Sequence, residues 1–322
     1  ALTLICDIVL RPLFQPQELE KERNVILEEL ASVEDNPGQI SELVLDGLLW
    51  PGQALGRDVA GTPGSVRAIP LADAAEYRFQ QYAPANAVLS VAGAVEPHEV
   101  AAITARATED WHFGTPAGWE RARPEIATRD VALHHKEIEQ AHLMVGLPAL
   151  SADHPDRFAL SLLISALGDG MSSRLFLNLR ERQSLAYDVN STTSHFRDCG
   201  SLVVYCGVEP KKSREAVHAV IEELQKMHDE APTEELTKAK EYTKGRLLLR
   251  LEDTRAVASW LATQELLQGK VSTPDQAVEN IDAVTVSDVA GVAQQLFRPD
   301  KLRLAVVGPH RGDKLFLKLL RF

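Results

Sequence analysis

The chain of 322 residues is long enough for two domains with a hydrophobic core each, and its 45% hydrophobic and 25% charged residues are typical of a globular protein. Its net charge of -12 argues against nucleic acid or an anionic membrane as the main partner. Three scattered cysteines without a CxxC pair predict reduced core thiols rather than a disulfide framework. With no signal peptide and no apolar run of membrane-spanning length, we expect a cytoplasmic protein with no membrane partner.

The first strongly patterned stretch runs from Pro16 to Glu34 and predicts an amphipathic helix. At about 100° per residue its apolar side chains form one stripe, and Glu22 and Glu29, seven positions apart, fall inside that stripe. Burying an unpaired carboxylate costs several kcal/mol, so two of them on a buried face need compensation. One explanation is a basic neighbour such as Arg23, and the other is a metal ion bound by one glutamate and supported by the second.

The remaining pattern alternates between short helices and strands. Further helices are expected at 39–49, 70–81 and 97–110, with a buried strand at 87–93. Residues 114–130, rich in glycine, proline and charge, are predicted to be an interdomain linker. Beyond the linker we expect paired strands at 131–137 and 141–147, strands at 186–194, 201–208 and 302–308, and helices at 156–167, 175–182, 213–228, 233–251, 254–268 and 285–297.

An internal repeat relates the two halves of the chain. Residues 69–93 align without a gap onto residues 284–308, which lie 215 positions later. The matches include Asp73 with Asp288, Pro84 with Pro299, Leu89 with Leu304 and Gly93 with Gly308. The repeat predicts two copies of one domain, of which the first lacks roughly 85 residues at its N-terminus.

The predicted fold is therefore α+β, with two tandem homologous domains that each pack helices on a mainly antiparallel sheet. Residues 1–113 are expected to be the remnant of the first domain, 114–130 the linker and 131–322 the second domain. On the repeat, Glu22 aligns with Ala239 and Glu29 with Arg246. Because the second copy lacks both carboxylates, the fold does not require them, which favours the metal explanation.

Two stretches resemble the pitrilysin/insulinase family of zinc metallopeptidases, which includes the mitochondrial processing peptidase. ELEKERNVILEELASVEDNP resembles the helix that carries that family's distal glutamate, and GDGMSSRLFLNLRERQSLAYDV resembles its second-domain signature. The resemblance implies that Zn²⁺ is held by two histidines of an inverted HxxEH motif and by a distal glutamate, with the motif's glutamate as general base. It assigns the distal ligand to Glu29 and its supporting carboxylate to Glu22.

The same resemblance assigns Arg180 and Tyr187 to substrate contact, because a guanidinium and a phenol can hold a peptide carbonyl and a developing oxyanion. It implies a zinc-dependent endopeptidase that acts on peptides or unfolded polypeptides inside a two-domain chamber. The expected assembly is a homodimer or a paired subunit, with no nucleic acid partner. Two departures from the family pattern are Asp169, where a glycine is usual, and Gln183-Ser184, where a basic residue and a glycine are usual.

The HxxEH motif is absent, since none of the ten histidines belongs to such a motif. We expect it, with the general base, upstream of Ala1, so the chain as given is predicted to be inactive alone and to bind zinc weakly. The alternative is a non-catalytic homologue that serves as a partner or core subunit. Retention of both the glutamate pair and the Arg/Tyr pair favours a catalytic parent. No GxSxG motif supports a serine hydrolase.

Overall fold

The computed structural model describes residues 1–111, 118–123, 130–230 and 232–320, and the chain divides into two compact units. Unit 1 contains Ala1–Ser32, Val59–Glu120 and Arg250–Val271, and unit 2 contains Val33–Asp58, Arg121–Leu249 and Ser272–Phe322. Each unit therefore takes residues from both copies of the repeat. The predicted linker lies outside the described residues except for 118–123 and 130, so the predicted domain division stays a prediction.

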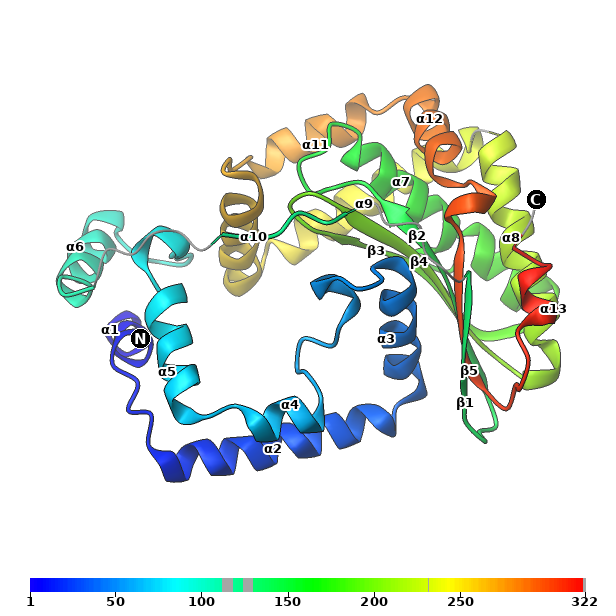
Figure 1. Cartoon of the computed structure of the whole chain (residues 1–322). Helices are drawn as coiled ribbons and strands as arrows, with labels where there is room; N and C mark the ends of the chain where they lie inside the picture. Colours follow the sequence, from blue (N-terminus) through cyan, green and yellow to red (C-terminus); the bar gives the residue numbers. More distant parts are fainter. Residues whose placement is uncertain (112–117, 124–129, 231, 321–322) are drawn as a thin grey trace. The chain divides into compact units, whose positions relative to one another are not determined.

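Unit 2 is built on one five-stranded sheet with the strand order β1-β5-β2-β4-β3 (Figure 1). The strands are β1 (Val131–His135), β2 (Ala141–Ala149), β3 (Ala186–His195), β4 (Gly200–Val208) and β5 (Arg303–Gly308). β1 and β5 are parallel, whereas the other neighbours are antiparallel. Helices packed on a mainly antiparallel sheet confirm the predicted α+β class.

The predicted pairing of the first two strands with each other is wrong. β5, which comes from the C-terminal part of the chain, lies between them, so that Val307 is opposite His134 of β1 and opposite His142 of β2. Pairing between segments so distant in sequence leaves no local turn signal, in contrast to a hairpin. The positions of these five strands were therefore predictable, and their order in the sheet was not.

Helices cover both faces of this sheet. α7 (Arg157–Gly168), α8 (Ser213–Asp229) and α12 (Val286–Leu296) lie on one face, and α3 (Pro37–Leu49) lies on the other (Figure 1). The further helices of unit 2 are α9 (Thr233–Arg250), α11 (Pro274–Ala283) and α13 (Lys314–Leu317), with short helical segments η1 (Ala54–Gly56), η3 (Phe176–Arg182), η4 (Pro210–Lys212) and η5 (Pro299–Lys301).

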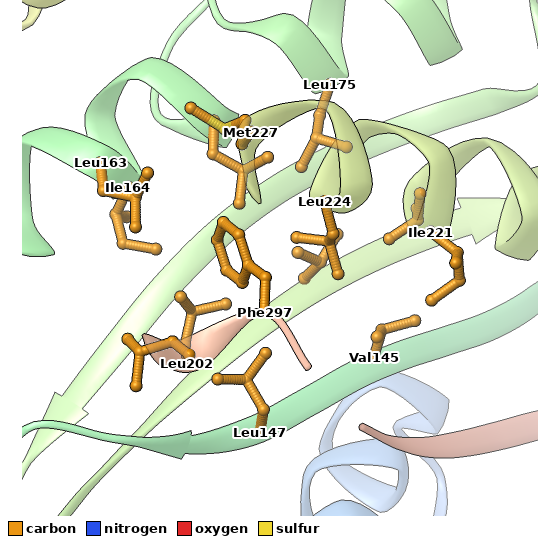
Figure 2. Packing of buried hydrophobic residues seen from close by; sticks show 14 of the residues in the cluster. Val145, Leu147, Leu163, Ile164, Leu175, Leu202, Ile221, Leu224, Met227 and Phe297 are labelled. Carbon is orange, nitrogen blue, oxygen red and sulfur yellow. The ribbon is translucent and has the colours of Figure 1, made fainter. Parts of the chain in front are cut away.

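Successive side chains of β2 point to opposite faces of the sheet, so this strand packs against helices on both faces. Leu143, Val145 and Leu147 belong to the main core, whereas Met144 packs with α3. In the main core, Leu147, Leu224 and Met227 lie around Phe297, whose side chain is fully buried (Figure 2).

α3 approaches the sheet closely at Gly146. A Cβ atom at this glycine would lie 2.7 Å from Cδ2 of Leu45, which is closer than van der Waals contact permits. Leu45 and Leu49 of α3, and Trp50 directly after it, pack there against Met144 and Ala305. A helix from the first copy of the repeat thus completes the second copy's sheet on its outer face.

Unit 1 contains helices α1 (Leu2–Leu10), α2 (Pro16–Glu34, whose last two residues belong to unit 2), α4 (Pro63–Ala68), α5 (Leu71–Gln81), α6 (Pro97–Ala107) and α10 (Thr254–Gln268), and the short η2 (Pro84–Asn86). The predicted buried strand at 87–93 is wrong: no strand forms there, and Leu89 and Val91 are exposed. Its equivalent in the repeat, β5, is paired on both edges. In the described part of unit 1 no neighbouring strand exists to satisfy the backbone of this segment.

The helices of the internal repeat agree in position, although the strand at 303–308 has no counterpart at 87–93. α5 and α12 begin and end 215 positions apart, and so do η2 and η5. α2 and α9 begin 217 positions apart, as do the N-caps Asn36 of α3 and Asp253 of α10. Among the described residues, no helix combines the length and the apolar character needed to cross a membrane.

Candidate functional site

The buried side of α2 differs from the predicted stripe. Leu30 is buried and Leu19, Ile26 and Val33 are half-buried, but Glu22 and Glu29 are exposed. The prediction that the two carboxylates lie within the buried face is therefore wrong. Val25, which lies on the far side of both glutamates around the helix, is also exposed, so the buried face ends near Val33 and both carboxylates reach solvent.

Arg23 does not neutralise the two glutamates. Its guanidinium pairs with Glu20, with Nε 3.2 Å from Oε2, and donates hydrogen bonds to the backbone oxygens of Val66 and Ile69. Among the described residues, the side chains of Glu22 and Glu29 have no hydrogen bond and no ion pair. Of the two explanations for this pair, the basic-neighbour explanation is therefore not supported.

The residues present do not make a zinc centre by themselves. In the part of the chain that the structure describes, no group of three or more His, Cys, Asp or Glu side chains could hold a metal ion. Zinc in proteins takes three or four protein ligands, chiefly imidazole, thiolate and carboxylate. Glu29 with Glu22 beside it fits one ligand of such a set and no more.

Arg180 lies on an unusual turn of helix in unit 2. η3 is a π-helix, and Gln183 donates its backbone N–H to the oxygen of Asn178, 3.0 Å away. The Arg180 guanidinium is exposed and lies 5.1 Å from the centre of the Phe176 ring, and within the described residues it has no hydrogen bond or ion pair. π-Turns are rare and frequently occur at functional sites.

Tyr187 also lies at an irregular position. The register of β3 against β4 shifts between Ala186 and Asp188, so Tyr187 is the extra residue of a β-bulge. Its side chain is 61% exposed, and among the described residues its hydroxyl has no hydrogen-bond partner. A bulge turns a side chain out of the normal alternation of a strand and is common next to active sites.

The two departures from the family pattern have local structural consequences. Ser184, between Arg180 and Tyr187, has a φ of 50°, a left-handed conformation for which glycine is favoured. Asp169 accepts a hydrogen bond at 2.5 Å from Nη1 of Arg246, which is the residue that the repeat aligns with Glu29. The charge at Asp169 is therefore paired within unit 2.

A polar groove of about 510 Å³, which was not predicted from the sequence, lies on the α3 side of the sheet. β3 contributes Asn190, Thr192 and Ser194 to it, and α3 contributes Glu42 and Asp46. The spacing of the two acids by one helical turn was visible in the sequence. The sheet face that they meet was not, because α3 packs on strands from the other copy.

Asp46, which lines this groove, makes the free energy of unfolding depend on pH. Burial and then the Glu42 carboxylate raise its pKa from 3.8 to about 6. Because the folded-state pKa lies above the unfolded value, ionised Asp46 destabilises the fold above about pH 6, and this effect is absent below about pH 4. After allowance for solvent screening, Asp46→Asn should raise the free energy of unfolding by about 1–2 kcal/mol at pH 8.

Chemical denaturation of the wild type and Asp46→Asn at pH 8 and pH 4 measures this difference. The two proteins should differ at pH 8 and agree at pH 4. A substitution that is neutral at pH 8, or that stabilises more at pH 4, would contradict the assignment.

Comparison with known proteins identifies the family. Residues 68–242 match a family model described as "Peptidase M16 inactive domain". The chain is also 33% identical over 318 residues to an uncharacterized zinc protease of Streptomyces coelicolor, in an alignment that covers 96% of this chain and 69% of the relative. The chain belongs to the peptidase M16 family. The resemblance seen in the α2 and 168–189 motifs is thereby confirmed.

Other M16 relatives agree with this assignment. The zinc protease YmxG of Bacillus subtilis, also uncharacterized, is 33% identical over 314 residues, covering 96% of this chain and 75% of YmxG. The crystal structure of a peptidase M16 inactive domain from Pseudomonas fluorescens superposes with a TM-score of 0.88 at 22% identity, covering 97% of this chain and 74% of that one. A chain in Complex III2 from Candida albicans superposes with a TM-score of 0.84 at 16% identity, covering 100% and 80%. These two structural matches show the M16 fold alone.

Proposed function

We propose that this chain is the polypeptide-binding part of a zinc endopeptidase of the inverted-motif type. In this proposal, unit 2 binds an extended peptide through Arg180 and Tyr187, and α2 supplies Glu29 as one zinc ligand, supported by Glu22. The two histidines and the general base of an HxxEH motif would come from residues that this sequence does not contain. The expected substrate is a peptide or an unfolded polypeptide.

The observation that carries the proposal is the placement of Arg180 and Tyr187 on two backbone irregularities. One residue lies on a π-helix and the other on a β-bulge, and both side chains are exposed without a hydrogen bond or ion pair in the described part of the chain. Irregular backbone has an energetic cost and persists where the surroundings enforce it, frequently at functional sites. A guanidinium and a phenolic hydroxyl both donate hydrogen bonds, which suits peptide carbonyl oxygens.

A direct test measures peptide binding by the 322-residue chain. A fluorescein-labelled unstructured peptide is titrated with wild type and Arg180→Ala, and fluorescence anisotropy gives the Kd. Since a hydrogen bond from a charged donor contributes about 1.5–3 kcal/mol, Arg180→Ala should weaken binding roughly tenfold or more.

Arg182→Ala is the matched control, because Arg182 is also exposed and lies two residues away on the same helix. It should leave the affinity unchanged. Equal affinity of wild type and Arg180→Ala, or equal weakening by both substitutions, would overturn the proposal.

The second candidate is a non-catalytic M16 subunit that assembles with a catalytic partner or with a second copy of the chain. Two observations favour it: the matching family model is described as an inactive domain, and the described residues offer only one part of a zinc ligand set. The two candidates differ at Glu29. In a non-catalytic subunit, Glu29→Gln should change neither the zinc content nor the activity of the assembly.

A further inference from the structure

A buried carboxylate lies beneath the π-helix that carries Arg180. Glu223 of α8 is 5% exposed, although its neighbours Val220, Leu224 and Met227 belong to the hydrophobic core. A buried carboxylate is costly unless hydrogen bonds compensate for its lost hydration. The carboxylate of Glu223 therefore needs its partners, and those partners identify what it stabilises.

The carboxylate of Glu223 accepts hydrogen bonds from two donors. Nδ2 of Asn178 lies 2.8 Å from Oε1 of Glu223, and Nζ of Lys226 lies 2.7 Å from the same oxygen. Lys226 belongs to the same helix as Glu223, one turn later, and its side chain is 52% exposed. Asn178 belongs to η3, so this contact fixes the π-helix to α8.

Asn178 also joins the start of the π-turn to its end at Gln183. Its side-chain oxygen accepts a hydrogen bond from Nε2 of Gln183 at 2.9 Å, and its backbone oxygen accepts one from the backbone N–H of Gln183 at 3.0 Å. The two ends of the turn are thus joined through one asparagine, and Arg180 lies between them. A π-turn has poorer local energetics than an α-turn and requires support of this kind.

Ser184, the residue after Gln183, has a hydrogen bond of its own. Nζ of Lys212 donates to the backbone oxygen of Ser184, 3.0 Å away, where the backbone is left-handed. This hydrogen bond holds the segment that leads from the π-helix to Tyr187. Leu179 of the same π-helix packs in the hydrophobic core, and of the polar contacts described, the one with Glu223 ties the Arg180 turn to a core helix.

We propose that Glu223, acting through Asn178, is a positioning residue that presents the Arg180 guanidinium to the bound polypeptide. The inference rests on the proposed function and identifies how the binding site is held. Glu223 is 5% exposed and its carboxylate is already bonded to Asn178 and Lys226, so its effect on Arg180 passes through the backbone of residues 178–183.

The test compares three substitutions in the 322-residue chain. Glu223→Leu removes the acceptor for Asn178, whereas Glu223→Gln keeps one in its amide oxygen. Glu222→Leu is the matched control, because it makes the same change one residue earlier at an exposed position. Peptide binding should weaken about fivefold or more in Glu223→Leu, remain within about twofold in Glu223→Gln, and be unchanged in Glu222→Leu.

A double-mutant cycle separates positioning from a general loss of stability. If Glu223 acts through Arg180, Glu223→Leu should have no further effect on peptide affinity in the Arg180→Ala background. Equal weakening in both backgrounds would overturn the inference. If Glu223→Leu fails to fold, as judged by circular dichroism, Asn178→Ala replaces it in the same cycle, with the same expected result.

A second readout is independent of peptide binding. The Nε–Hε resonance of Arg180 in an ¹H–¹⁵N spectrum should shift or broaden in Glu223→Leu and stay in place in Glu223→Gln and Glu222→Leu. An unchanged resonance in a folded Glu223→Leu protein would overturn the positioning inference. Unchanged peptide affinity in Arg180→Ala, with a shifted resonance in Glu223→Leu, would instead overturn the proposed function alone.

Discussion

Replacing Arg180 by alanine in a complete M16 peptidase that contains this chain should lower kcat by roughly 10²–10³. A preorganised donor aimed at the carbonyl oxygen stabilises the charge that develops there, and this contact strengthens as the oxygen becomes an oxyanion. Tyr187→Phe removes a neutral donor and should have a smaller effect in the same direction. The measurements are steady-state kinetics on a quenched fluorescent peptide and the zinc content of each variant.

The control for this prediction is Arg182→Ala, which changes an exposed arginine of the same helix and should retain wild-type kcat. Zinc content should be equal in all the variants, because neither Arg180 nor Tyr187 is a proposed zinc ligand. Peptide hydrolysis by Arg180→Ala within about twofold of wild type would show that unit 2 shapes the binding site without taking part in the chemistry.

Glu29→Gln in the same complete enzyme should remove the metal and the activity together. A neutral amide is a much weaker zinc ligand than a carboxylate, and loss of one ligand from a three-ligand site leaves too few donors for tight binding. Elemental analysis of zinc per chain, with peptide hydrolysis measured on the same preparation, checks both effects. Glu22→Gln should weaken zinc binding less, because a supporting carboxylate orients the site without bonding the metal.

Glu28→Gln is the matched control for Glu29, since Glu28 is the exposed glutamate immediately before it on α2. It should retain zinc and activity. The 322-residue chain alone should bind zinc weakly, because its described residues contain no group of three or more side chains that could hold a metal ion. Stoichiometric zinc in that chain would show that further ligands lie within it and would contradict the assignment of Glu29 as a lone contributor.

Local patterns in the sequence predicted the elements and the family. The positions of α2, α5, α7, α8 and α12 follow from apolar periodicity and cap residues, which act over a few neighbouring positions. The repeat of 69–93 at 284–308 predicted matching elements in the two copies, because similar sequence encodes similar local structure. The motifs around Glu29 and from Gly168 to Val189 were sufficient to predict the M16 family.

Long-range packing decided what those patterns could not. The insertion of β5 between β1 and β2 joins segments from opposite ends of unit 2, and no local signal specifies that neighbour. The apolar residues at 87–93 have the composition of a strand, but a strand also needs hydrogen-bonding neighbours, and the described part of unit 1 has none. Glu22 and Glu29 lie to the side of the α2 stripe, because the surface that packs against a helix determines how wide its buried face is.

The same distinction between local patterns and long-range packing applies to the candidate site. Arg180, Tyr187 and Glu29 could be identified from the sequence, because their motifs are contiguous stretches. The β-bulge at Tyr187 and the burial of Glu223 could not, since a bulge depends on the register of two strands, and α8 alone gives no indication that one of its glutamates meets Asn178. The sequence by itself predicted which residues belong to the site, and their roles stay predictions. Only the tertiary structure decided what holds them in place, because those contacts join segments that are distant along the chain.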